Sequence, residues 1–330
     1  MARNILVTGG AGYIGSHTCK ALARAGYAPI VYDNFVYGHE WAVKWGPFER
    51  GDILDRERLD AVIRRHAPEA VIHFAAFTYV GESVAEPLKY YRNNVAGSLS
   101  LLESIRAARI GAMVFSSTCA TYGIPQASPI GEGLPQAPVN PYGRTKLVME
   151  WMLEDFAATG ALSYVALRYF NAAGADSDCE IGEAHSPETH LIPLAIEAAL
   201  DPRRELQLYG LDYPTPDGSA VRDYVHVDDL ARAHVAAVDY LLDGGKPVAL
   251  NVGTGKGASV LEVIAAIERH TGRKVPWTAA PRRPGDPPVL FADASRLKAV
   301  LNIDPESFAG LDAIIETAWR WHMKQHNAAK

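Results

Sequence analysis

Short apolar runs recur through the first half of the chain, and each is followed by a segment whose apolar positions have helical spacing. The runs are rich in Val, Ile, Leu and Ala, which is typical of strands buried on both faces. They predict strands at Asn4–Thr8, Ala28–Asp33, Ala70–Phe74, Ala112–Ser116 and Leu162–Arg168. The helix-like segments follow Gly12, Asp55, Pro87 and Pro141. Strands that alternate with helices imply right-handed crossovers, so we expect an α/β fold with a doubly wound parallel sheet.

The pattern changes near residue 172, where Gly, Pro and Asp become more frequent. Shorter helical segments are predicted near 191–200, 228–242, 259–271 and 308–324. We therefore expect a first lobe at 1–171 and a smaller α/β lobe at 172–330, with segments near 224–240 packing back onto the first. Because no linker separates the lobes, they are expected to share a cleft.

Composition narrows the possible partners of the chain. The 330 residues include 48% hydrophobic and 21% charged residues, as in an ordinary globular protein. A net charge of −6 and a pI near 6.0 lack the basic patch that nucleic acid requires. The three cysteines (Cys19, Cys119, Cys179) have no zinc-type spacing and favour a reducing compartment. We expect a cytoplasmic protein with a small-molecule ligand, no metal, no nucleic-acid partner and no membrane association, since no leader or long apolar stretch is seen.

A glycine-rich turn follows the first predicted strand directly. Gly9, Gly12 and Gly15 stand where a dinucleotide pyrophosphate would meet the N-terminus of a helix. Side chains at these points would block the approach of the phosphates or keep helix and strand apart, whereas free N–H groups and the helix dipole attract negative charge. The turn predicts a dinucleotide-binding site.

Asp33 ends the second predicted strand, where a carboxylate can accept hydrogen bonds from an adenosine ribose and would repel a 2′-phosphate. This favours NAD over NADP. Gly51-Asp52-Ile53 follows the next short apolar stretch, and two interpretations of Asp52 remain open: a contact to the adenine, or an N-cap of the following helix.

Tyr142 and Lys146 are spaced so that a helix places them on one face. A phenol has a pKa near ~10, and a cation close to it favours the ionised form. The pair therefore predicts a tyrosine that accepts protons near neutral pH.

With the glycine-rich turn, Asp33, His73-Phe-Ala-Ala76, Ser116-Ser-Thr118 and Tyr142-x-x-x-Lys146 in this order, the chain resembles the extended short-chain dehydrogenase/reductase family over nearly its whole length. Within that family it is most similar to the UDP-glucose 4-epimerase group. The motifs that carry this resemblance are Val80-Gly-Glu-Ser83, Asn93-Asn-Val95, Arg168-Tyr-Phe-Asn-Ala-Ala-Gly174, Val221-Arg-Asp-Tyr-Val-His226, Asn251-Val-Gly-Thr-Gly255 and Arg282-Arg-Pro-Gly-Asp286. The resemblance implies a Rossmann-type NAD-binding lobe and a nucleotide-sugar-binding lobe.

The resemblance also implies a reaction, the reversible interconversion of UDP-glucose and UDP-galactose. Tyr142 would take the proton of the sugar 4-hydroxyl while NAD removes a hydride from C4, giving a 4-keto sugar that turns over and is reduced on its opposite face. Lys146 would lower the tyrosine pKa and bind the nicotinamide ribose, and Thr118 would bond the reacting oxygen and help relay the proton.

Further roles follow from the same resemblance. The implied cofactor-binding residues are Gly9, Gly12, Tyr13, Ile14, Gly15, Asp33, Asn34, Asp52, Ile53, Phe74, Ala75, Asn93, Tyr142, Lys146 and Tyr169. The implied substrate-binding residues are Thr118, Asn171, His190, Leu191, Tyr209, Arg222, Arg283, Asp286 and Leu290. Surface ion pairing remains the alternative for each arginine, and a plain polar residue at a helix start remains the alternative for His190. Relatives also imply a homodimer through helices around 87–109 and 141–160.

Two positions depart from the group and bear on the substrate. Thr78 stands where many of these enzymes have a lysine, so one cation is missing. Leu290 stands where relatives vary between tyrosine and a small residue, and its intermediate bulk disfavours N-acetyl sugars. Leu290, Phe77-Thr-Tyr79 and Ser117-Thr-Cys-Ala-Thr-Tyr122 are also similar to relatives that act on UDP-xylose and UDP-arabinose, so a pentose substrate is the main alternative.

Other functions on the same fold fit the residues less well. A nucleotide-sugar 4,6-dehydratase needs an Asp-Glu pair directly after the catalytic Thr, but Cys119 and Ala120 stand there. A net NAD-dependent oxidoreductase would use the same constellation as an epimerase. A cofactor-sensing regulator would not require Tyr142, Lys146 and Thr118 together.

Overall fold

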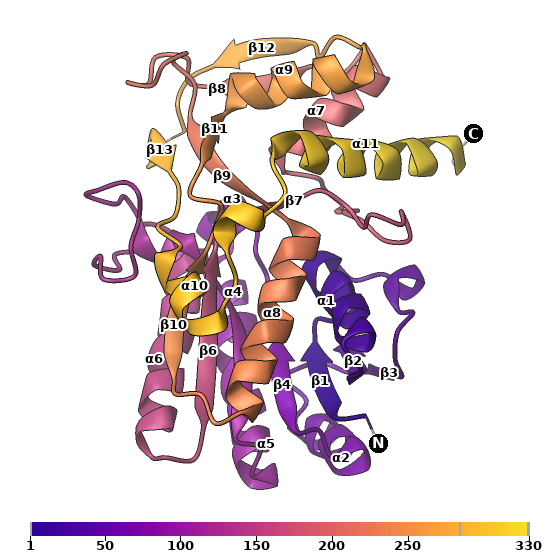
Figure 1. Cartoon of the computed structure of the whole chain (residues 1–330), viewed down its shortest axis with the longest axis vertical. Helices are drawn as coiled ribbons and strands as arrows, with labels where there is room; N and C mark the ends of the chain where they lie inside the picture. The colour runs from indigo at the N-terminus through magenta and orange to yellow at the C-terminus, as the bar shows by residue number, and fades with distance from the viewer. Residues whose placement is uncertain (1, 284, 329–330) are drawn as a thin grey trace.

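A parallel sheet of seven strands is the centre of the larger lobe in the computed structural model, which describes residues 2–283 and 285–328 (Figure 1). Its strand order is β10-β6-β5-β4-β1-β2-β3. The strands are β1 (Asn4–Thr8), β2 (Ala28–Asp33), β3 (Phe48–Arg50), β4 (Ala70–His73), β5 (Ala112–Thr118), β6 (Ser163–Tyr169) and β10 (Val248–Val252). The order reverses between β1 and β4, which is where ligands bind in sheets of this kind. The predicted doubly wound parallel sheet is confirmed.

Strand predictions were right where an apolar run was long. β1 and β2 have the predicted bounds, and β4, β5 and β6 differ from prediction only at their ends. The sequence reading missed β3, a short strand whose Phe48 and Arg50 are exposed, and β10, which lies well inside the segment assigned to the second lobe. Short or displaced strands carry too little apolar pattern to be recognised.

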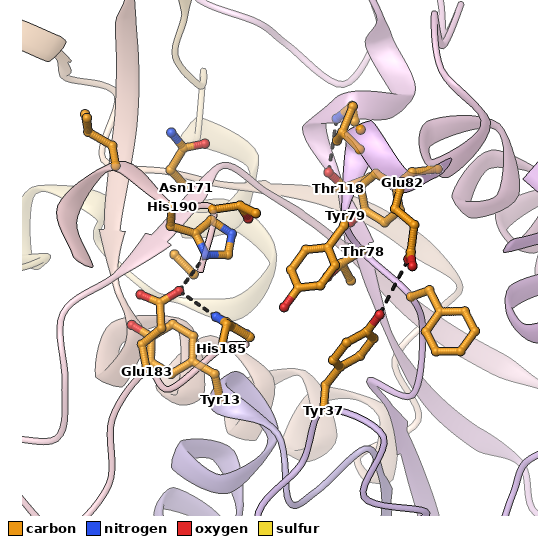
Figure 2. Close-up of a pocket in the computed structure, with 18 of the residues that line it drawn as sticks. Tyr13, Tyr37, Thr78, Tyr79, Glu82, Thr118, Asn171, Glu183, His185 and His190 are labelled. Carbon is orange, nitrogen blue, oxygen red and sulfur yellow. Dashed lines mark hydrogen bonds and ion pairs between the residues drawn. The ribbon is translucent and has the colours of Figure 1, made fainter. Parts of the chain in front are cut away.

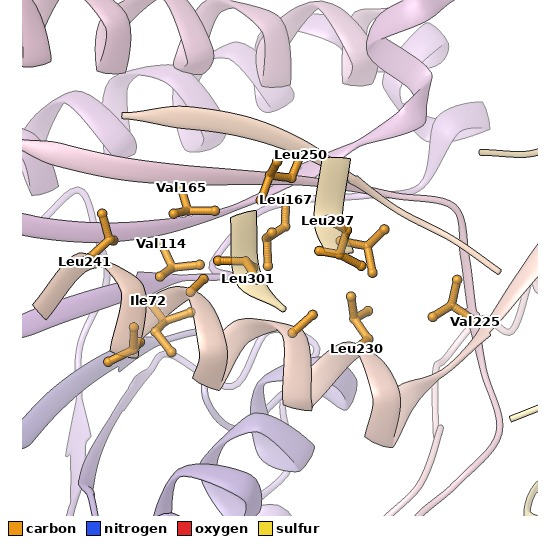
Figure 3. Packing of buried hydrophobic residues seen from close by; sticks show 14 of the residues in the cluster. Ile72, Val114, Val165, Leu167, Val225, Leu230, Leu241, Leu250, Leu297 and Leu301 are labelled. Carbon is orange, nitrogen blue, oxygen red and sulfur yellow. The ribbon is translucent and has the colours of Figure 1, made fainter. Parts of the chain in front are cut away.

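Helices cover both faces of the sheet. On one face lie α1 (Tyr13–Arg24), α8 (Val227–Leu242) and α10 (Ser295–Leu301), and on the other lie α2 (Arg56–His66), α5 (Gly97–Ala108) and α6 (Pro141–Ala158). Figure 3 shows the first of these layers, where Leu230 and Leu241 of α8 and Leu297 and Leu301 of α10 meet the strands. Neighbouring strand residues such as Val71 and Ile72 point to opposite layers, because side chains alternate along a strand.

The remaining elements of the larger lobe are short. They are α3 (Val80–Ala85), α4 (Pro87–Tyr90), the π-helix η2 (Tyr91–Ala96) that leads into α5, and the turns η1 (Glu40–Ala42), η3 (Cys119–Tyr122) and η4 (Pro305–Ser307). The helix predicted after Pro87 is therefore real but irregular at its start. Elements α3 and α10 were not predicted.

The smaller lobe has its own core beside the carboxyl ends of the sheet strands (Figure 1). Its helices α7 (Leu191–Leu200), α9 (Val260–Thr271) and α11 (Leu311–Ala328) lie close to the predicted ranges. Its strands are β7 (Asn171–Ala173), β8 (Leu206–Tyr209), β9 (Val221–His226), β11 (Gly257–Ser259), β12 (Trp277–Ala280) and β13 (Val289–Leu290). β9 is central, pairing with β7, β11 and β13, and β12 pairs with β8.

Chain order and lobe membership do not coincide after residue 171. α8 packs on α1, β10 extends the large sheet beside β6, and α10 packs on both. We propose that the first lobe comprises residues 1–171 together with these three returning elements and the turn η4, and that the rest of 172–330 forms the second lobe. The chain then passes from the second lobe to the first at His226, which ends β9 and caps α8.

Candidate active site

A cavity of about 1590 Å³ lies at the carboxyl ends of β1, β4 and β5 and continues under the smaller lobe. It brings together residues from far apart in the chain. Of the residues predicted for cofactor or substrate, its lining includes Gly9, Gly12, Tyr13, Ile14, Gly15, Asp33, Asn34, Ile53, Phe74, Ala75, Asn93, Thr118, Tyr142, Tyr169, Asn171, His190, Leu191, Tyr209, Arg222, Arg283, Asp286 and Leu290. Asp52 and Lys146 lie behind this lining.

The glycine-rich turn is packed so closely that side chains are excluded. Gly9 has φ +75°, and a Cβ there would lie 2.6 Å from the backbone nitrogen of Ala75. A Cβ on Gly15 would lie 2.2 Å from the carbonyl oxygen of Gly9. Gly12 is the N-cap residue of α1 and makes no side-chain cap bond. The turn therefore presents bare backbone and a helix N-terminus to the cavity, which suits a pyrophosphate.

Asp33 is oriented by the backbone around it. Its Oδ2 accepts a hydrogen bond from Ala11 N at 3.0 Å, and its Oδ1 accepts one from Phe35 N at 2.8 Å. Burial raises the pKa of this carboxyl, whereas these N–H groups lower it. The carboxylate lies in the cavity wall, where a ribose hydroxyl can reach it.

The contacts of Asp52 show that it is not the N-cap of α2, whereas its contact to the adenine stays a prediction. Its Oδ2 accepts a hydrogen bond from Asn34 Nδ2 at 2.9 Å, and its Oδ1 accepts one from Leu54 N at 2.9 Å. The N-cap of α2 is Asp55, whose side chain accepts from Arg58 N. Asp52 therefore orients Asn34, which lines the cavity, and closes a local turn.

Tyr142 stands in the first turn of α6, beside the end of β5. Asn140 caps this helix by accepting from Gly143 N at 2.8 Å, and Pro141 begins it with a preset φ. A Cβ on Gly143 would lie 2.7 Å from the carbonyl oxygen of Ala120, so α6 lies tightly against the turn after β5. The phenol is thereby held at the carboxyl end of β5, next to Thr118.

Lys146 is not among the groups that shift the pKa of Tyr142, and its expected role in lowering that pKa stays a prediction. Burial raises the pKa of Tyr142, and the opposing influence is a hydrogen bond with Thr118. The Lys146 ammonium donates to the carbonyl oxygen of Ser116 at 2.7 Å and lies 4.9 Å from the centre of the Phe115 ring. Burial lowers the pKa of Lys146 to about 7, and Glu150 opposes this shift.

Glu150, one helical turn beyond Lys146, is a buried charge that the sequence reading missed. Arg168 donates from Nε to Glu150 Oε1 at 3.0 Å, and Ser117 also donates to this carboxylate. The Arg168 guanidinium in turn donates to Tyr122 Oη at 2.9 Å. These bonds give the buried carboxylate the partners that it needs and fix α6 against β5 and β6.

Thr118 ends β5 in the cavity wall. Its Oγ1 accepts from Ala120 N at 3.1 Å, which caps the turn η3 and orients the hydroxyl. Cys119 also lines the cavity, and burial raises the pKa of its thiol to about 12, so it stays protonated. Tyr169, on the neighbouring strand β6, shares a short hydrogen bond with Ser116 Oγ, and burial raises its pKa to about 12.

Charged side chains from separate segments of the smaller lobe form the side of the cavity opposite the glycine-rich turn. Arg222 on β9 bonds to Asp286, and its Nη1 donates to the Val221 carbonyl oxygen at 2.7 Å. The guanidinium carbon of Arg283 lies 4.0 Å from the centre of the Tyr209 ring. Both predicted arginines therefore face the cavity while also taking part in local contacts.

Leu290 and Thr78 both line the cavity, as does Asn171 at the start of β7. Leu290 pairs with Arg222 in the parallel register of β13 and β9, so the residue expected to limit the sugar stands directly beside an arginine. Thr78 precedes Tyr79, whose phenol donates to the Pro187 carbonyl oxygen at 3.1 Å.

His190 is the N-cap residue of α7, yet its side chain makes no cap bond. Its Nδ1 lies 2.6 Å from Glu183 Oε1 instead. Figure 2 shows Glu183 between His185 and His190, facing Tyr79 and Thr118 across the pocket. The sequence reading missed Tyr79, Glu183, His185 and Arg204 as lining residues. The run of Glu and His residues at 183, 185, 188 and 190 could have indicated Glu183 and His185.

Within 2–283 and 285–328, no helix combines the length and apolar character needed to cross a membrane.

Comparison with known proteins gives a family and similar enzymes. Residues 5–253 match the family described as "NAD dependent epimerase/dehydratase family". A UDP-glucose 4-epimerase of Rhizobium meliloti (strain 1021) is 56% identical over 323 residues, which cover 98% of each chain.

Solved structures agree with this match. The structure of UDP-glucose 4-epimerase from Brucella ovis in complex with NAD has a TM-score of 0.94 at 56% identity, covering 97% of this chain and 98% of that one. The UDP-glucose 4-epimerase from Stenotrophomonas maltophila, with bound NAD and formylated UDP-arabinopyranose, has a TM-score of 0.95 at 42% identity, covering 99% of each chain.

Proposed function

The chain belongs to the NAD dependent epimerase/dehydratase family, and from that premise we propose that its cavity interconverts UDP-glucose and UDP-galactose by inverting C4 of the sugar. The observation that carries this proposal is the meeting of Tyr142 and Thr118 with the glycine-rich turn in one cavity. The near full-length similarity to enzymes named UDP-glucose 4-epimerase supports the reaction.

The residues present fit NAD. The closeness of Gly9 and Gly15 to neighbouring backbone leaves an open cradle that a Cβ would fill, and the Asp33 carboxylate lies where it would repel a 2′-phosphate. Gly12, Tyr13, Ile14 and Asn34 would hold the dinucleotide near the turn. Ile53, Phe74, Ala75, Asn93, Tyr169 and Lys146 would hold its remaining parts. When bound, NAD accepts a hydride from C4, returns it to the other face, and carries a positive charge on its nicotinamide ring.

Tyr142 moves the proton. Its phenolate takes the proton of the sugar 4-hydroxyl, and the phenol returns it after the sugar has turned over. Since burial raises the pKa of Tyr142 in the chain itself, the ionised phenol requires positive charge close to it, and Lys146, one turn further along α6, would supply part of that charge. Thr118 bonds the same sugar oxygen and keeps the proton path short.

The substrate side would hold the nucleotide diphosphate by charge. Arg222 and Arg283 present planar guanidinium groups that match phosphate oxygens. Asp286 holds Arg222 in place, and Tyr209, whose ring lies against Arg283, would contact the base. Asn171, His190 and Leu191 would contact the diphosphate and its sugar, next to Leu290.

The alternatives receive less support. Dehydration lacks its acid and base, because Cys119 stays protonated and Ala120 has no ionisable group. Neither pentose epimerisation nor net oxidation is favoured, since the similar proteins are named UDP-glucose 4-epimerase. One of these proteins does hold a formylated UDP-arabinopyranose, so a pentose belongs in any substrate test.

We further propose that two copies pair through α4, α5 and α6. Large apolar side chains are exposed there, with Leu88 81%, Leu99 48% and Trp151 55% accessible. An apolar surface of this kind marks a protein contact. Light scattering should give twice the chain mass, and a monomeric mass would reject the pairing.

The free thiols of all three cysteines fit a reducing compartment such as the cytoplasm.

The decisive assay offers the purified protein UDP-glucose, UDP-xylose and UDP-GlcNAc in parallel, with added NAD⁺ or NADP⁺. We expect UDP-galactose from the first substrate with NAD⁺, without accumulation of NADH. Failure to convert UDP-glucose at any NAD⁺ concentration would reject the proposal, and faster conversion of UDP-xylose would reassign the substrate.

A further inference from the structure

A short segment at residues 182–190 joins the larger lobe to α7 and carries a compact group of charges. Glu183, His185, Glu188 and His190 each offer one polar atom, and these atoms lie within 4.8 Å of one another. Glu183, His185 and His190 also line the cavity (Figure 2). The group therefore forms part of the cavity wall.

Glu183 is the centre of this group. One oxygen, Oε1, lies 3.0 Å from His185 Nδ1 and 2.6 Å from His190 Nδ1, and its side chain is only 4% exposed. Glu188 Oε1 accepts from Thr189 N at 2.7 Å and from His190 N at 2.8 Å. A buried carboxylate needs such partners, because an unpaired one would lose its hydration without compensation.

The backbone of the segment is held by three separate elements. Trp321 of α11 donates from Nε1 to the Glu183 carbonyl oxygen at 2.8 Å. His39 Nε2 lies 2.6 Å from the Ala184 carbonyl oxygen. Tyr79 Oη donates to the Pro187 carbonyl oxygen at 3.1 Å. Glu183 thus has a fixed position relative to both lobes.

The start of α7 depends on this fixed position. His190 is its N-cap residue, and its side chain bonds to Glu183 rather than to the first turn of the helix. Leu191 and Ile192 line the cavity, and first-turn N–H groups have no partners inside a helix. The Glu183–His190 contact therefore sets where these N–H groups and the imidazole meet an anion.

At neutral pH the two histidines of this group carry protons and do not bind a metal ion. Glu183 and Glu188 raise the pKa of His185 to about 9 and that of His190 to about 10. A protonated imidazole cannot ligate a metal, so a divalent cation would have to displace two protons first. Two imidazolium groups and two carboxylates neutralise one another.

We propose that Glu183 is a positioning residue for UDP-sugar binding, which acts by fixing His190 and the first turn of α7 at the wall where the diphosphate lies. The inference rests on the proposed function. It adds an acidic residue to a site whose direct contacts to an anion are otherwise basic or neutral.

The test compares Glu183→Gln with Glu180→Gln. Glu180 lies on the same part of the chain and pairs with Lys20 at 2.6 Å, away from the histidines. Loss of one charge-assisted hydrogen bond should raise the KM for UDP-glucose about tenfold and change kcat less than about twofold. Glu180→Gln should change neither. An unchanged KM in Glu183→Gln, or an equal rise in Glu180→Gln, would overturn the proposal.

A double-mutant cycle of Glu183→Gln and His190→Gln tests whether Glu183 acts through His190. If Glu183 acts through His190, the double variant should bind UDP no more weakly than the weaker single variant, whereas additive losses would contradict the link. His190→Gln alone should weaken UDP binding, which keeps the test valid if Glu183→Gln fails to fold. Calorimetric UDP binding needs no turnover, so these results are separate from failure of the epimerase assay. A stoichiometric divalent cation in the purified protein would also overturn the proposal.

Discussion

The cofactor side and the substrate side of the cavity are built differently. On the cofactor side, Gly9 and Gly15 lie against backbone and Asp33 is held by two N–H groups, all within the first two strand ends. On the substrate side, Arg222 is held by Asp286, which is distant in sequence, and Arg283 lies over Tyr209. Local backbone geometry defines the first side, and long-range charge pairs define the second.

This difference has a consequence for function. A site made of backbone tolerates little change and binds one kind of ligand, here a dinucleotide. A site made of side chains on separate loops changes its preference through single substitutions, because each contact is independent. We therefore expect cofactor choice to be robust and sugar choice to be adjustable, and the following predictions test that division.

The largest effect is expected where the two sides meet. Tyr142→Phe removes the proton acceptor but keeps the ring, so kcat should fall by roughly 10²–10⁴ while NAD content stays the same. Steady-state kinetics and cofactor extraction measure both. Tyr240→Phe is the matched control, because Tyr240 lies outside the cavity lining and its phenol bonds, among the described residues, only to Lys246 backbone atoms. A Tyr142→Phe enzyme with normal kcat would mean that another group is the base.

On the cofactor side, Asp33→Asn should weaken NAD binding by about 10- to 100-fold, the scale of one hydrogen bond to a charged group. UDP binding should stay the same. Calorimetry with NAD, NADP and UDP gives the three affinities. Asp60→Asn is the control, since Asp60 on α2 pairs with Arg56, lies outside the cavity lining and should leave all three within about twofold. A loss of UDP affinity in Asp33→Asn would break the proposed independence of the two sides.

On the substrate side, Arg222→Lys should raise the KM for UDP-glucose about tenfold, because lysine cannot form the planar two-point contact with a diphosphate. NAD binding should remain normal. Arg282→Lys provides a neighbouring control, as Arg282 pairs with Asp212 and lies outside the cavity lining. Equal effects of the two substitutions would show that the Arg222 change acts through general charge.

The smallest effect concerns the charge group at residues 183–190. The pKa values of His185 and His190 are raised above 6.5, so their contribution to stability is complete below about pH 6.5 and is lost as pH rises through about 9 and about 10. The Glu188 pKa is lowered, so its contribution is complete above about pH 4.5 and is lost in acid.

Deprotonation of these two histidines should therefore lower the Tm by about 2–4 °C between pH 7 and 10, which calorimetry can measure. Most of the change should come from His185, because water screens the half-exposed His190. In Glu183→Gln the change should be smaller. An identical pH dependence in that variant would mean that other groups cause it.

The same division decides what could be predicted from sequence. β1, β2 and the glycine-rich turn are local patterns, and they were placed correctly because the physical constraint and the motif occupy the same few residues. β10 was missed because its role depends on pairing with β6, which the sequence of Val248–Val252 does not display. The packing of a segment near 224–240 on the first lobe was expected, and α8 lies there against α1. Local propensity says nothing about the corresponding return of α10.

The charge environment of the site was the least predictable part. Tyr142 and Lys146 are four residues apart on α6, as expected, yet the Lys146 ammonium bonds to Ser116. The raised pKa of Tyr142 comes from burial, a property of the folded whole. The sequence likewise does not show that Glu150 is buried against Arg168, or that Glu183 is buried against His190.

The most direct test of the account follows the hydrogen on C4. UDP-glucose deuterated at C4 is incubated with the protein and NAD⁺, and the product is examined by NMR and mass spectrometry. If Tyr142 moves only the hydroxyl proton and NAD returns the same hydrogen to the opposite face, UDP-galactose will retain deuterium at C4 and free NADH will not accumulate. Loss of the label to water, or NADH formed in step with product, would contradict the account.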